Sequence, residues 1–104
     1  MTQLNDANMK KSAEIFKAVG NLHRLKIIAY LIEGEKHVSD INAVVNVSQP
    51  ALSQHLRRLR AVGVLGSRRD RRQIYYFIAH EHRTQLVALL TNLASMVNSS
   101  KLAA

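Results

Sequence analysis

The chain has 104 residues, a formal net charge of +8 and an isoelectric point near 10.5. This length suits one domain with a single core, and the excess of basic residues favours a polyanionic partner over an acidic small substrate. The complete lack of cysteine excludes disulfides, thiolate metal ligands and thiol nucleophiles. No run reaches the roughly 18 apolar residues of a membrane span, so we expect a soluble, cytoplasmic protein with no membrane partner.

The first third of the chain has apolar residues at helical spacing in two segments. A first amphipathic helix is predicted over residues 9–19. A second is predicted over residues 22–32, with Asn21 as its N-cap and Gly34 as its stop. The apolar positions of the second segment recur at three and four residues, which is typical of a helix that packs in a core.

Two further helices are predicted to meet at a short, tight turn. The third follows Ser39 and ends at Asn46, a residue that tolerates the left-handed conformation. The fourth spans residues 49–62, because Ser48 is a good N-cap and Pro50 lies in the first turn, where its missing N–H is harmless.

The spacing changes after Gly63. Residues 64–65 and 74–78 are short runs rich in β-branched and aromatic side chains, and the basic stretch between them predicts a hairpin. Helical spacing returns over residues 80–97. The order α-α-α-α-β-β-α over residues 1–104 predicts a single winged helix-turn-helix domain, a mainly α fold with a small β-hairpin.

The first and last helices carry apolar stripes that a domain of this size has too little material to cover. A homodimer joined through the N- and C-terminal helices would bury them. Two copies would also place two recognition helices about 34 Å apart, one turn of DNA, on a palindromic site.

Positive charge is concentrated in residues 57–72. Seven arginines and one aspartate fall there, which gives +6 of the formal +8. Such a concentration predicts a polyanionic partner, with double-stranded DNA as the first candidate.

The fourth predicted helix has one apolar side and one polar side. Three leucines at positions 52, 56 and 59 define the buried side, and His55 beside them is expected to bond a backbone carbonyl in the interior. Glutamine and arginine can match the edges of adenine and guanine in the major groove. The residues predicted to contact DNA from this helix and its start are Ser48, Gln49, Pro50, Ser53, Gln54 and Arg57.

The predicted hairpin has an arginine-rich tip. Side chains there fan outward and can reach phosphates or a narrowed minor groove, so they should supply affinity more than sequence choice. Asp70 is expected to be a turn residue that bonds its own backbone. Arg58 and Arg60 lie on the flanks of the preceding helix, where phosphate contact and plain solvation are equal alternatives. The predicted phosphate contacts of the tip are Arg68, Arg69, Arg71 and Arg72.

Three stretches resemble the ArsR/SmtB family of bacterial winged-helix repressors. Residues 18–27, AVGNLHRLKI, are similar to the entry to that family's second helix. Residues 48–56, SQPALSQHL, are similar to its recognition-helix signature and are the most specific of the three. Residues 63–65, followed by the basic turn and residues 74–76, resemble its wing.

The resemblance implies a homodimer that represses its own operon by binding an operator and that is released when an inducer binds. The resemblance does not identify the inducer. Many relatives sense metals through cysteines near the start of the third helix, and residues 35–40 here hold no thiol. Others sense oxidants through a cysteine pair, at places that correspond to Ala29 and Ser95 in this chain.

The resemblance also implies a zinc site between the last helices. His80, Glu81 and His82 match its first half, but Leu93 and Met96 stand where further ligands would be needed, and a closed tetrahedral site takes four donors. We therefore expect no metal and no other cofactor.

Two alternatives stay open beside the repressor. One is a metal-responsive repressor with an irregular site at the start of the last helix. The other is a non-specific nucleic-acid-binding module, for which the positive charge alone would suffice. An enzyme is not expected, because the sequence holds no paired carboxylates, no glycine-rich phosphate loop and no serine in a nucleophile motif.

Overall fold

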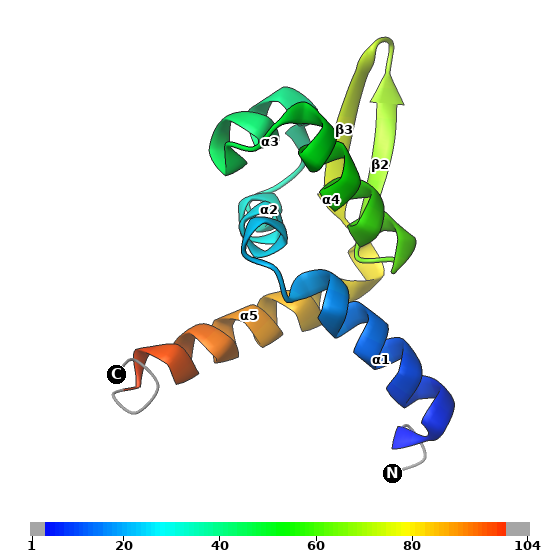
Figure 1. The fold of residues 1–104 in the computed structure, drawn as a ribbon, viewed down its shortest axis with the longest axis vertical. Coiled ribbons are helices and arrows are strands. Elements are labelled where there is room, and N and C mark those ends of the chain that lie inside the picture. The colour runs from blue at the N-terminus through cyan, green and yellow to red at the C-terminus, as the bar shows by residue number, and fades with distance from the viewer. Residues whose placement is uncertain (1–3, 100–104) are drawn as a thin grey trace.

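The structure of the protein is a computed structural model, in which residues 4–99 are described. The predicted winged helix-turn-helix is confirmed, with one short strand and one short 3-10 helix in addition (Figure 1). The elements, in chain order, are α1 (Asp6–Val19), α2 (Leu22–Ile32), β1 (Lys36–His37), α3 (Val38–Val45), α4 (Gln49–Ala61), β2 (Leu65–Asp70), β3 (Gln73–Ile78), the 3-10 helix η2 (His80–His82) and α5 (Arg83–Asn98).

The molecule divides into a compact part and two projecting helices. Figure 1 shows α2, α3, α4 and the hairpin gathered together, while α1 and α5 extend away from them at the end opposite the hairpin tip. The fully buried side chains come mainly from the compact part: Ile27, Ile28, Leu31, Ile41, Leu52, Leu56, Leu59 and Ile78. At roughly 1.5–3 kcal/mol for each buried aliphatic side chain, this cluster is the main source of stability.

The turn between α3 and α4 is built as the sequence predicts. Asn46 adopts the left-handed conformation, with φ of 57°, and its N–H donates to the carbonyl of Asn42. Ser48 then caps α4 by accepting a hydrogen bond from the N–H of Ala51 at 3.3 Å. These two residues fix the angle at which α4 leaves α3.

Four helices begin or end at a residue other than the expected one. The first begins at Asp6, three residues before the predicted start, because the side chain of Asn5 accepts from the N–H of Asn8 and caps it. The third helix begins at Val38, before Ser39, because the ring Nδ1 of His37 accepts from the N–H of Ser39 and so acts as the N-cap. The fourth helix ends at Ala61, one residue early. The last helix begins at Arg83 because residues 80–82 wind as a 3-10 turn.

The sheet has three antiparallel strands in the order β1-β3-β2. Tyr76 lies on the central strand, opposite Lys36 of β1 and Ser67 of β2. The expectation that Asp70 lies in the turn is wrong, because Asp70 is the last residue of β2 and pairs with Gln73. The two intervening arginines therefore form the turn.

Candidate nucleic-acid interface

The outward face of α4 is polar and exposed, as its helical spacing requires. Ser53, Gln54 and Arg57 are all exposed, while Leu52 and Leu56 are buried on the opposite side. Gln49 and Pro50 are also exposed in the first turn. The structure therefore presents on the surface of α4 the side chains that the sequence assigned to DNA contacts from this helix. Ser48 at its start is exposed as well, but its hydroxyl also serves as the cap.

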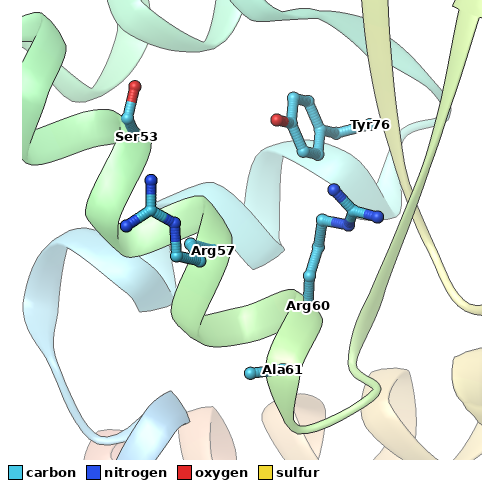
Figure 2. A pocket seen from close by; sticks show the side chains of 5 residues that line it. All are labelled: Ser53, Arg57, Arg60, Ala61 and Tyr76. Carbon is cyan, nitrogen blue, oxygen red and sulfur yellow. The ribbon is translucent and has the colours of Figure 1, made fainter.

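A cleft of about 490 Å³ lies between α4 and the sheet. Figure 2 shows Ser53, Arg57 and Arg60 on α4 and Tyr76 on β3 around it; Arg60 extends toward the Tyr76 ring, and the Tyr76 hydroxyl points from the strand toward α4. Sequence reasoning missed Tyr76 because it stands in a run of strand-forming residues and looks like core. The available signal was the two-residue spacing between Tyr76 and the buried Ile78. Side chains two residues apart share one face of a strand, so Tyr76 lies on the helix-facing side of the sheet.

A second cleft, of about 380 Å³, lies on the other flank of α4. Its lining includes Gln54, Arg57 and Arg58 on the outer side of α4. Arg24 and His55, which contact one another behind the helix, line its inner side. Arg58 is exposed. Basic side chains thus line both flanks of α4, which suits a helix that inserts between two phosphate backbones.

Arg68 does not belong to the tip cluster that the sequence predicted. Its guanidinium forms two hydrogen bonds with the Glu35 carboxylate, at 2.7 and 2.6 Å, and lies 4.5 Å from the centre of the Tyr75 ring. Those hydrogen bonds hold the pKa of the Glu35 carboxyl below its ordinary value. Because side chains alternate along a strand, Arg68 and Tyr75 occupy the sheet face turned away from Tyr76.

The hairpin tip carries the remaining three arginines, all exposed. Arg71 and Arg72 form the two-residue turn, and Arg69 Nε donates to the carbonyl of Arg71 at 2.8 Å. Arg71 has φ of 60°, in the left-handed region that favours glycine. Arg71 is therefore a charged residue at a position whose backbone conformation favours glycine.

Replacing Arg71 by glycine separates the effect of its backbone conformation on stability from the effect of its charge on DNA binding. We expect the unfolding free energy to stay the same or rise by up to about 1 kcal/mol, because glycine suits this conformation. Affinity for DNA should fall, and the slope of log K against log salt should shrink by about one, because one phosphate contact is lost. Urea titration and salt-dependent shift assays measure the two effects. A variant with unchanged salt dependence would contradict the assigned role of Arg71.

Arg24 and His55 form a polar contact behind α4. Arg24 is only 9% exposed, and its guanidinium donates to the carbonyls of Lys17 and Ala18 at the end of α1. Its Nη1 lies 3.1 Å from Nδ1 of His55. His55 is thus an inward-facing histidine, as expected, but its partner is a guanidinium and not a backbone carbonyl.

The contact makes stability depend on pH. Burial lowers the pKa of His55, and the charges of Arg24 and His23 add to the effect. A histidine whose pKa is lower in the folded state stabilises the fold fully above its unfolded value of 6.5, and the stability falls as pH drops from there toward the folded pKa. We expect His55→Gln to reduce the loss in unfolding free energy between pH 7.5 and pH 5.5, measured by urea titration. An equal loss in both proteins would contradict this.

The three metal-ligand candidates do not converge. His80, Glu81 and His82 occupy consecutive positions of η2, which a 3-10 helix points about 120° apart. The His80 ring stacks on Phe77 at 5.3 Å, and Nε2 of His82 lies 3.5 Å from the Glu81 carboxylate. Within residues 4–99, no three side chains of histidine, cysteine, aspartate or glutamate come together in a way that could hold an ion.

Comparison with known proteins agrees with this architecture. Residues 23–66 match the family model described as bacterial regulatory protein, arsR family. The chain is 30% identical to the transcriptional activator HlyU of Vibrio cholerae over 93 residues, which cover 89% of this chain and 86% of HlyU. This chain belongs to the ArsR family. The biofilm growth-associated repressor of Xylella fastidiosa is 35% identical to the chain over 78 residues, 75% of this chain and 68% of that protein.

Two solved structures superpose closely on this chain. HlyU from Vibrio cholerae gives a TM-score of 0.77 at 30% identity and covers 86% of this chain and 97% of its own. A homodimeric winged helix-turn-helix DNA-binding domain from Mycobacterium bovis gives 0.77 at 31% identity and covers 91% of both chains. The chain is thus a winged helix-turn-helix transcriptional regulator. No helix within residues 4–99 is long and apolar enough to cross a membrane.

Proposed function

We propose that the protein is a cytoplasmic homodimeric repressor that binds a palindromic operator, including that of its own operon. The polar face of α4, held between two basic clefts and beside the arginine-rich hairpin tip, is the observation that carries this proposal. Gln54 and Arg57 would contact base edges, and the flanking and tip arginines would contact phosphates.

Dimerisation is supported by the apolar surface of the projecting helices. Met9 and Phe16 of α1 are 54% and 60% exposed, and Leu93 and Met96 of α5 are 42% and 54% exposed. Several large apolar side chains on the two projecting helices are more than an isolated protomer normally exposes. A second copy would cover them, and the related domain from Mycobacterium bovis is itself homodimeric.

We further propose that regulation uses no resident metal. The His80 ring stacks on Phe77, so only Glu81 and His82 of the three candidates on η2 lie together, and the chain has no cysteine to complete a site elsewhere. Equilibrium dialysis of purified protein against zinc tests this proposal. We expect no zinc bound more tightly than micromolar, and tighter binding with one ion per protomer would contradict it.

The operator proposal is tested with a duplex that the protein itself selects from a random pool. We expect the selected duplex to be palindromic and bound about a thousandfold more tightly than a scrambled one at physiological salt. Gln54→Ala should cost about 1–3 kcal/mol on the selected duplex and little on the scrambled one. Gln85→Ala, an exposed glutamine on α5, is the matched control. Equal affinity for both duplexes would leave only a non-specific binding module.

A further inference from the structure

We propose that the cleft between α4 and β3 is a binding site for one backbone phosphate, formed by Arg60 and Tyr76 next to the base-contacting Arg57. The inference rests on the proposed DNA binding; it adds Tyr76 to the residues that would contact the duplex and assigns Arg60, one of the flanking arginines, to one particular phosphate. The phosphate would belong to the strand of the duplex that runs between the recognition helix and the hairpin.

The position of the cleft selects the backbone. The hairpin rises beside α4 and extends past it, so the two elements lie next to each other in one surface (Figure 1). When α4 enters the major groove, the hairpin reaches the neighbouring minor groove, and a single sugar-phosphate strand separates the two grooves. A cleft between helix and hairpin must therefore face that strand.

The chemistry of the cleft suits an anion. Its polar lining consists of hydrogen-bond donors: the Ser53 hydroxyl, the guanidinium groups of Arg57 and Arg60, and the Tyr76 hydroxyl. Among the described residues, no carboxylate lines it. Within residues 4–99, these four side chains take part in no hydrogen bond or ion pair with the rest of the protein. Their donors are free for a phosphate, which offers several acceptor oxygens.

The two sides of the cleft differ in rigidity. Tyr76 is half-buried, packs against the core and lies on the central strand between Lys36 and Ser67, so its hydroxyl is held in place before DNA arrives. Arg60 is exposed on the last turns of α4 and can close onto a phosphate from the other side. A fixed donor loses little conformational entropy on binding, which makes Tyr76 the positioning contact and Arg60 the main source of charge.

The test compares Arg60→Gln and Tyr76→Phe with two matched controls. Lys26→Gln removes an exposed positive charge from α2, and Tyr30→Phe removes the hydroxyl of another half-buried tyrosine. Arg60→Gln should weaken binding to both the selected and the scrambled duplex about tenfold and lower the salt slope by about one. Tyr76→Phe should weaken both several-fold, and the controls should bind like the unaltered protein. Thermal unfolding confirms that each variant is folded.

Neutral methylphosphonates placed one at a time along the selected duplex locate the phosphate. One position in each half-site should weaken binding by the unaltered protein and have almost no further effect on Arg60→Gln, because the partner is already gone. The cleft proposal is overturned if Arg60→Gln keeps the full salt slope, or if every methylphosphonate acts equally on both proteins. Equal affinity for the selected and scrambled duplexes would instead contradict the operator proposal. In that case the salt slope of Arg60→Gln would still show whether the cleft binds a phosphate.

Discussion

Leu93→Glu is expected to separate the protomers and lower affinity for a palindromic duplex by about a hundredfold or more. Leu93 is 42% exposed on α5, outside the buried cluster, so the compact part should stay folded. A glutamate at the proposed contact between copies would bury an unpaired charge, which costs several kcal/mol. Affinity then falls because two linked recognition helices no longer bind one duplex together.

Sedimentation equilibrium and shift assays measure the two parts of this prediction. Thr91→Glu is the control, because Thr91 is exposed on the same helix but about 200° around it from Leu93. Circular dichroism should show both variants helical. A Leu93→Glu protein that sediments as a dimer, or a monomer that binds the palindrome undiminished, would refute the proposed role of α5.

Arg24→Met is expected to lower the unfolding free energy by about 2–4 kcal/mol, far more than the loss of any exposed arginine. The methionine keeps the apolar stem but leaves the carbonyls of Lys17 and Ala18 and the ring of His55 without their common donor. Arg24→Lys should recover only part of the loss, because a single ammonium cannot span acceptors on two helices.

Urea denaturation measures this loss, and Arg58→Met supplies the control. Arg58 is exposed on α4, so its replacement should change the unfolding free energy by no more than about 0.5 kcal/mol. The effects of Arg24→Met and His55→Gln should not add, since both remove the same contact. A loss for Arg24→Met no larger than that for Arg58→Met would show that the buried guanidinium is dispensable.

The sequence predicted α4 and its flanking turns well because local chemistry decides them. Ser48, Pro50 and Asn46 each have a strong positional preference, and three leucines repeat at helical spacing around them. The strand β1 was missed because two residues, Lys36 and His37, are too few to show any period. It exists only because β3 offers a partner.

Two errors at the candidate site concern long-range partners. Arg68 was assigned to the tip, yet it pairs with Glu35, 33 residues away, because the strand register places it on the far face of the sheet. His55 was given a backbone partner, and its actual partner, Arg24, lies 31 residues away. The spacing of residues along a helix or strand determines the face on which a side chain lies. It does not determine which distant residue packs against that face.

The strand order β1-β3-β2 leaves β2 at the edge of the sheet, and this position gives its arginines a second use. An exposed edge strand offers unpaired backbone groups to any other chain, and charged side chains on that strand discourage such pairing. Arg68 and Arg69 both lie on β2. Removing the positive charge of this hairpin should therefore lower solubility as well as DNA affinity, and variants with β-branched apolar residues at these two positions should aggregate most.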